Sequence, residues 1–239
     1  MTAALDYLVA SRRSGQPEGI TSVCSAHPLV LRAALRHGCE NGSRVLLEAT
    51  CNQVNHLGGY TGMQPADFAA LVEKIADEEG FPADRIILGG DHLGPNPWRN
   101  RPAQEAMVEA EEMVAAFIKA GFRKIHLDAS MGCKGEPAAL DDQTTAERAL
   151  RLATVAEEVA KAAGNKMPFY IIGTEVPPPG GADHILTALE PTSRAAARQT
   201  INVHRDFFKK AGLEQAFSRV IALVVQPGSG VRQSQRHSV

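Results

Sequence analysis

Short apolar segments alternate with amphipathic segments along this chain of 239 residues. Six apolar segments are rich in Val, Ile and Leu and end in turn residues, which predicts β-strands. They are GITSVCSA (19–26), RVLLEAT (44–50), RIILGGDH (85–92), KIHLDAS (124–130), FYIIGTE (169–175) and RVIALVVQP (219–227). The segments between them repeat apolar residues at helical spacing, as Ala106, Ala110, Met113, Val114 and Phe117 do, which predicts helices.

Glycines mark the expected helix ends, because a left-handed residue commonly terminates a helix. Five of them follow helical segments: Gly38, Gly80, Gly121, Gly164 and Gly212. Regular strand–helix alternation predicts a parallel sheet with helices packed outside it. The architecture is therefore either a (β/α)8 barrel or an open doubly wound sheet.

The first strand and the polar residues of later strands favour the barrel. The first strand leads into SVCSAHPLVL, which lacks the glycine pattern of a dinucleotide or phosphate loop. In KIHLDAS, His126, Asp128 and Ser130 alternate with apolar residues. Polar residues on one face near the carboxyl end of a strand fit the mouth of a barrel. We predict an α/β fold of the TIM (β/α)8 type.

The number of repeats predicts an incomplete barrel. Six βα units are visible, whereas a closed barrel of this type needs eight. The residues SGVRQSQRHSV at the end of the chain are polar and show no strand pattern. We therefore expect one partial barrel domain over residues 1–228 and a disordered tail over residues 229–239.

Charge and composition narrow the function classes. The formal net charge is −2, and the chain has no basic stripe, so we expect no nucleic-acid partner. No apolar run approaches the roughly 18 residues of a membrane span, and the N-terminus lacks the order of a signal peptide. These features predict a cytoplasmic protein without membrane contact.

Polar residues gather where the predicted strands end, and in a barrel such positions converge. They are Cys24, His27, Glu48, Thr50, Asn52, Asp91, His92, His126, Asp128, Ser130, Glu175 and Gln226. His92 and Glu175 have the donor types of a catalytic metal site, and Asp91 could act as a general acid or base. A polar turn remains the alternative interpretation, because an Asp–His dipeptide alone is common.

Five segments together resemble a known family, the non-catalytic subunit of class II tagatose-bisphosphate aldolase. They are LLEATCNQVNHLGGYTGM, ILGGDHLGPNPW, KIHLDASM, IIGTEVPPPGGA and RVIALVVQPG. The resemblance extends from about Leu5 to Gly228. It implies an aldolase-like TIM barrel, a role in galactitol, N-acetylgalactosamine or tagatose 6-phosphate catabolism, and a catalytic aldolase subunit as partner. Many members carry the label tagatose-6-phosphate kinase, but this chain shows no phosphate-binding glycine loop with its lysine.

The family is similar to zinc-dependent class II aldolases, and this similarity implies roles for single residues. Asp91 would be the proton donor, His92 a metal ligand and Glu175 a carboxylate near the metal, with zinc the expected ion. Catalytic aldolases also take histidine ligands from later strand ends. Here Gln226 stands at the end of the sixth strand, and His184 in the loop after the fifth strand is a candidate substitute.

The resulting predicted site has three parts. The catalytic residues are Asp91 and Asp128, and the metal ligands are His92 and Glu175. The contacts to a sugar or sugar phosphate are Glu48, Asn52, Gly59, His126, Ser130 and Gln226.

Three functions stay open at this point. The chain is a non-catalytic partner subunit, a metal-dependent 4-epimerase or aldolase acting on a ketose or ketose phosphate, or an inactive truncated fragment. The sequence does not specify the sugar, activity in isolation, or the oligomeric state, a homo-oligomer included.

Overall fold

The structure is a computed structural model, and it describes residues 5–15, 18–173 and 191–226. One six-stranded parallel sheet contains all its strands, in the order β1-β2-β3-β4-β5-β6. The strands are β1 (Ser22–Cys24), β2 (Val45–Thr50), β3 (Ile86–Leu93), β4 (Lys124–Leu127), β5 (Phe169–Ile172) and β6 (Val220–Leu223). Each lies within one of the six predicted segments or extends past it by one residue, so these predictions are confirmed.

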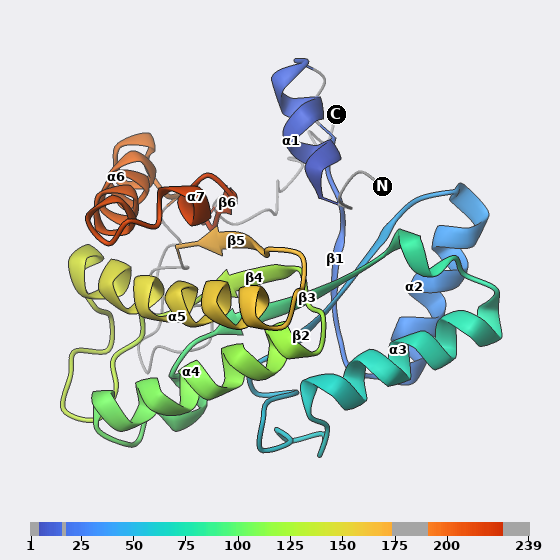
Figure 1. The fold of residues 1–239 in the computed structure, drawn as a ribbon, viewed down its shortest axis with the longest axis horizontal. Coiled ribbons are helices and arrows are strands. Elements are labelled where there is room, and N and C mark those ends of the chain that lie inside the picture. Colours follow the sequence, from blue (N-terminus) through green and yellow to red (C-terminus); the bar gives the residue numbers. More distant parts are fainter. Residues whose placement is uncertain (1–4, 16–17, 174–190, 227–239) are drawn as a thin grey trace, which may run out of the picture.

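From α2 onward helices follow the strands, and consecutive helices pack side by side along the sheet (Figure 1). They are α1 (Asp6–Arg13), α2 (Pro28–Asn41), α3 (Pro65–Glu79), α4 (Ala103–Lys119), α5 (Asp142–Ala162), α6 (Arg194–Lys210) and α7 (Glu214–Phe217), with short 3-10 turns η1 (Ala83–Arg85) and η2 (Asn96–Trp98). Parallel neighbours need such crossover helices, and this is the βα repetition that the sequence predicts.

The helices bury one apolar stripe each against the sheet. In α4 the stripe includes the five residues predicted from helical spacing, and all five are fully buried: Ala106, Ala110, Met113, Val114 and Phe117. Burial of each large side chain in such a stripe contributes about 1.5–3 kcal/mol. The core therefore lies between the helix layer and the sheet.

One predicted helix end is wrong. Gly38 lies inside α2, where a β-carbon would come 2.5 Å from the side chain of Val45. Glycine is needed there for close packing, and the helix ends instead at Gly42, whose φ is 71°. Gly80 does end its helix, with a φ of 66°.

The sheet has two outer strands in the part of the chain that the structure describes. β1 pairs only with β2 and β6 only with β5, so the described strands do not close into a barrel. The α/β fold is confirmed, with six parallel strands in sequence order and helices between them. Of the predicted tail, nothing is described, since residues 227–239 lie outside the described ranges.

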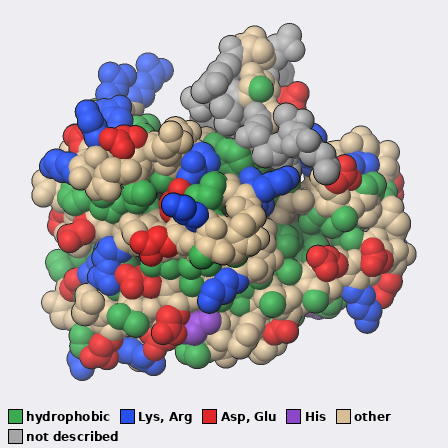
Figure 2. Space-filling model, viewed as in Figure 1, with side chains coloured by type: hydrophobic (Ala, Val, Ile, Leu, Met, Phe, Trp, Pro, Cys, Tyr) green, Lys and Arg blue, Asp and Glu red, His purple; other side chains and the backbone are tan. Residues whose placement is uncertain are grey.

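Two surface features bear on the expected partners. Acidic and basic side chains are interspersed on the face seen in Figure 2, and they form no continuous basic patch there. No described helix combines the length and the apolar character that crossing a membrane requires.

Candidate functional site

The carboxyl end of β3 directs two successive polar residues to the same place. Successive side chains of a regular strand point to opposite faces. Here the pairing of β3 with β4 shifts register between Gly90 and Leu93, and His92 has a φ of 51°. A bulge of this kind re-aims a side chain. As a result, His92 Nε2 lies 3.7 Å from Asp91 Oδ2.

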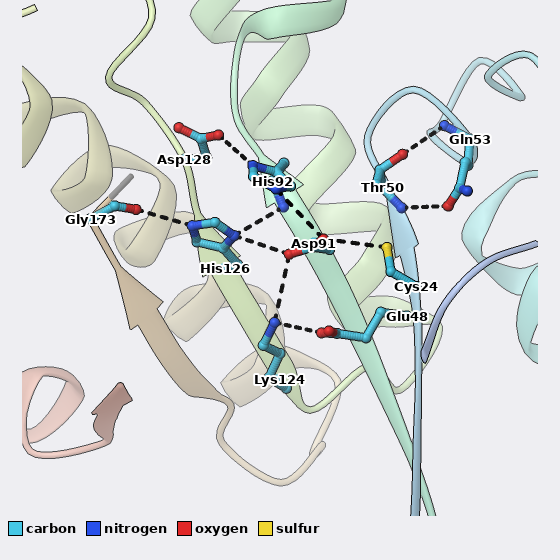
Figure 3. Close-up of polar contacts among 10 residues, drawn as sticks. All are labelled: Cys24, Glu48, Thr50, Gln53, Asp91, His92, Lys124, His126, Asp128 and Gly173. Carbon is cyan, nitrogen blue, oxygen red and sulfur yellow. Dashed lines mark hydrogen bonds and ion pairs between the residues drawn. The ribbon is translucent and has the colours of Figure 1, made fainter. Parts of the chain in front are cut away.

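His92 is the one non-glycine residue with positive φ in the described ranges, and two contacts hold it there. Its backbone N–H donates to His126 Nδ1 at 3.3 Å, and its own Nδ1 lies 2.7 Å from Asp128 Oδ2 (Figure 3). Such a backbone conformation costs of order 1–3 kcal/mol and persists only where the surroundings enforce it. The strain is concentrated at the residue whose side chain the site needs.

His126 comes from β4 and faces Asp91. Its Nε2 lies 3.1 Å from the carbonyl oxygen of Gly173, to which it can only donate. In the neutral ring Nδ1 is then an acceptor, and it lies 3.1 Å from Asp91 Oδ1. Asp91 Oδ1 accepts a hydrogen bond from this ring only when Nδ1 carries a proton, and a metal ion between the two atoms would take the place of that proton.

Both carboxylates of the site ionise more readily than usual. Burial alone would raise the pKa of Asp91, but the hydrogen bond to His126 and the charges of His92 and Lys124 lower it well below its ordinary value. Burial opposes ionisation of Asp128 too, and contacts with His92 and His126 lower its pKa. At neutral pH both Asp91 and Asp128 are therefore carboxylates.

The arrangement fits a divalent metal ion. Asp91, His92 and His126 each offer a ligand atom, and these atoms lie within 4.8 Å of one another. Imidazole and carboxylate are ligands that zinc and similar ions take. Asp128 behind His92 matches the carboxylate that commonly orients a ligating histidine. We call Asp91, His92, His126 and Asp128 the interior cluster.

The interior cluster differs from the predicted site in its membership. His126, which the sequence predicts as a substrate contact, lies with the candidate ligands. Glu175 and His184 lie outside the described residues, so their predicted roles stay predictions.

Sequence reasoning missed Lys124, at the start of β4. Its Nζ lies 2.5 Å from Glu48 Oε1 and 3.7 Å from Asp91 Oδ1. The signal was available, because Lys124, His126 and Asp128 alternate along one strand and so share a face. Glu48 is 1% exposed, and burial raises its pKa although Lys124 opposes this.

Two further predicted residues contact the interior cluster. Ser130 Oγ donates to Asp128 Oδ1 at 3.3 Å, and the Cys24 thiol donates to Asp91 Oδ2 at 3.3 Å. Burial and the neighbouring carboxylate of Asp91 raise the pKa of Cys24. His27 instead caps α2, where its Nδ1 accepts from the backbone N–H of Leu29.

Asn52, Gly59 and Gln226 make backbone contacts of their own. The Asn52 carbonyl accepts from the Tyr60 N–H at 2.9 Å, and a β-carbon on Gly59 would come 2.4 Å from the Gln53 carbonyl oxygen. The Gln226 N–H donates to Thr192 Oγ1 at 2.8 Å. The three residues stay predicted substrate contacts.

A second group of histidine and carboxylates lies where the loop after β2 meets α4. His56 Nε2 lies 3.0 Å from Glu109 Oε2 and 3.5 Å from Glu112 Oε2. Arg101 Nη1 also contacts Glu109, at 2.6 Å, and the His56 ring packs against Trp98 with a centroid distance of 5.4 Å. We call His56, Glu109, Glu112 and Arg101 the rim cluster. Its His56, Glu109 and Glu112 ligand atoms also lie within 4.8 Å of one another, but Arg101 already balances the charge of Glu109, so we interpret the cluster as a link between the loop and α4.

Fold and site define an α/β protein with a sequential parallel sheet and a polar, metal-compatible centre at the carboxyl ends of its strands. Residues 5–238 match the family described as D-tagatose-1,6-bisphosphate aldolase subunit GatZ/KbaZ-like. The chain belongs to this family, which confirms the resemblance seen in its sequence.

Two relatives show how far the similarity extends. Over 228 residues the chain is 64% identical to the D-tagatose 6-phosphate 4-epimerase of Agrobacterium fabrum (strain C58 / ATCC 33970), covering 95% of this chain and 54% of that protein. The crystal structure of a "probable tagatose 6 phosphate kinase" from Sinorhizobium meliloti 1021 matches with 55% identity and a TM-score of 0.78, covering 88% of this chain and 49% of the other. The chain thus spans about half the length of these relatives.

Proposed function

We propose that this chain carries the proton-transfer and metal-binding part of a 4-epimerase acting on a ketose 6-phosphate, with D-tagatose 6-phosphate as the substrate. The observation that supports it best is the interior cluster, in which Asp91, His92 and His126 face one another. A protein that served only as a scaffold would not need a strained His92 directed at a carboxylate. The 64% identity to an epimerase adds support from the sequence.

Epimerisation at C4 and aldol cleavage share their first bond change, which relates the epimerase to the aldolase family. A 2-ketose carries its C4 hydroxyl in the β position to the carbonyl. Removal of the O4 proton lets the C3–C4 bond break, because the C2 carbonyl takes up the electron pair as an enediolate. If the aldehyde rotates so that its opposite face meets the enediolate, the C3–C4 bond re-forms with inverted configuration at C4, and O4 regains its proton. An aldolase would instead release the two halves.

Asp91 is the proposed proton acceptor and donor for O4. It is a carboxylate at neutral pH, the form that can take the O4 proton and later return it as the acid. Asp128 is the positioning carboxylate, which holds the His92 ring through Nδ1.

His92 and His126 would hold a divalent ion, with zinc the expected one, and Asp91 would lie beside it. Such an ion supplies Lewis-acid stabilisation of charge on a sugar oxygen. Glu175 remains a further proposed ligand from the sequence.

The test is turnover of D-tagatose 6-phosphate, followed by NMR as the appearance of D-fructose 6-phosphate, with Zn²⁺ or Mn²⁺ added. We expect Asp91→Asn to lower turnover at least about 100-fold, since proton transfer contributes about 10²–10⁴-fold. Asp84→Asn is the matched control, because Asp84 is exposed in η1. Equal turnover in wild type and Asp91→Asn would rule the proposal out.

The description of the family favours a second candidate, a subunit that supports a catalytic tagatose-bisphosphate aldolase subunit. It predicts no turnover by this chain alone and a higher activity or thermal stability of the catalytic subunit on mixing. An inactive fragment would show neither effect and no metal binding. The three outcomes separate the three functions that the sequence leaves open.

A further inference from the structure

Glu48, Gly89 and Lys124 lie in one row across three strands. In the sheet register Glu48 pairs with Gly89, and Gly89 pairs with Lys124. A β-carbon on Gly89 would come 2.3 Å from Glu48 Oε1. The missing side chain therefore lets the carboxylate and the ammonium group meet directly over β3, at 2.5 Å.

This ion pair is buried, with side-chain exposures of 1% for Glu48 and 11% for Lys124. Removing two charges from water is costly, and apolar residues of similar volume often stabilise a protein as much or more. Stability alone is thus a poor reason for an ion pair at this place. Its position suggests another reason, since Lys124 Nζ also lies 3.7 Å from Asp91 Oδ1 (Figure 3).

The three groups form a chain that ends at the candidate catalytic carboxylate. Glu48 holds the lysine from the side of β2, and the ammonium group faces Asp91, two residues beyond Gly89 on β3. Lys124 and His126 both contact the Oδ1 atom of Asp91. The Oδ2 atom faces His92 Nε2 and Cys24 instead. The two oxygens of Asp91 thus have separate surroundings, and Lys124 contributes to fixing one of them.

We propose that Lys124 is a positioning residue that orients the Asp91 carboxylate, and that buried Glu48 is its anchor. This role rests on the proposed function, in which Asp91 transfers the proton. It assigns Glu48 to support of the site, where the sequence predicts a substrate contact. The row also explains why residue 89 is a glycine, because any side chain there would separate the two charges.

The test must separate positioning from charge compensation, and three variants do so. Lys124→Met and Glu48→Gln each remove one charge, and the double variant removes both while the net charge stays the same. Each single variant leaves one partner buried without its counter-charge, so we expect the unfolding temperature to fall by about 10 °C. In the double variant we expect it to recover to within about 3 °C of wild type.

Turnover should not recover with stability. We expect kcat of the double variant to stay about 100-fold below wild type with little change in KM, because a small misplacement of a reacting group costs about that much. If kcat recovers together with the unfolding temperature, Lys124 only balances Glu48 and the proposal is wrong. Lys119→Met, on an exposed lysine at the end of α4, is the matched control and should leave all readouts unchanged.

A readout without turnover separates this proposal from the proposed function. Calorimetric titration with Zn²⁺ should show about tenfold weaker binding in the double variant, because Asp91 loses its orientation although the net charge is unchanged. Unaltered Zn²⁺ affinity in a stably folded double variant would contradict the positioning role, even if the chain has no epimerase activity at all.

Discussion

The interior cluster and the rim cluster contain the same residue types but are built differently. Each has a histidine between two carboxylates. At the rim, the carboxylates come from one face of α4 and Arg101 balances one of them. In the interior, they come from neighbouring strands, a second histidine joins them, and the backbone at His92 is strained. Under the proposed function, what distinguishes the two clusters is convergence from several strands and not residue type alone.

The largest expected effect concerns the glycine that lets β3 approach the next strand. A β-carbon on Gly94 would come 1.6 Å from the backbone carbonyl oxygen of Asp128. Gly94→Ala should therefore lower the free energy of unfolding by about 3 kcal/mol or more, because backbone cannot move aside cheaply. Gly62→Ala, in the loop of the rim cluster, has open space and a φ of 76°, so it should cost only about 1 kcal/mol. Urea denaturation of both variants measures the difference, and equal losses would contradict this packing.

The second effect concerns the carboxylate behind His92. Asp128→Asn keeps the shape but weakens the contact with His92 Nδ1, so we expect Zn²⁺ affinity to fall 10–100-fold. At the rim, Glu112→Gln should leave Zn²⁺ affinity unchanged. Competition with a fluorescent chelator measures both. A rim variant that weakened binding as much as Asp128→Asn would reverse the assignment of the two clusters.

The third effect is a dependence of stability on pH in metal-free protein. The pKa of Asp128 is lowered from 3.8 in the folded chain, so its contribution to stability is present above about pH 4 and is lost as the pH falls through the folded value. Asp128→Asn lacks this contribution. The difference in unfolding temperature between wild type and Asp128→Asn should therefore shrink between pH 6 and pH 3. A difference that stayed constant over this range would show that the carboxylate charge does not matter there.

The smallest effect belongs to the rim. His56 is 14% exposed and joins its loop to α4, so His56→Ala should cost about 1 kcal/mol of stability. Hydrogen exchange of residues 55–61 should become faster, while turnover per folded molecule changes little. Exposed His37 supplies the control variant His37→Ala, which should leave both unchanged. Loss of metal in His56→Ala would make the rim cluster the metal site.

Much of this fold follows from local pattern, whereas the site does not. The stripe of α4 is visible in the sequence because helical spacing is a local property. The helix end predicted at Gly38 was wrong, because the sequence does not distinguish a glycine that ends a helix from one that is needed for close packing. The contact with Val45 that requires this glycine is visible only in the folded chain. His92 shares a side with Asp91 only through a bulge, and no alternation rule places two successive residues together. Lys124 could have been predicted from its alternation with His126 and Asp128. Its ion pair with Glu48 across Gly89 could not, because that contact depends on the register of the sheet.

The most direct test of the interior cluster is calorimetric titration of Zn²⁺ into wild type, His92→Ala and His56→Ala. The account predicts one ion per chain in wild type and in His56→Ala, and affinity at least about 100-fold lower in His92→Ala. Binding that survives His92→Ala but disappears in His56→Ala would contradict it.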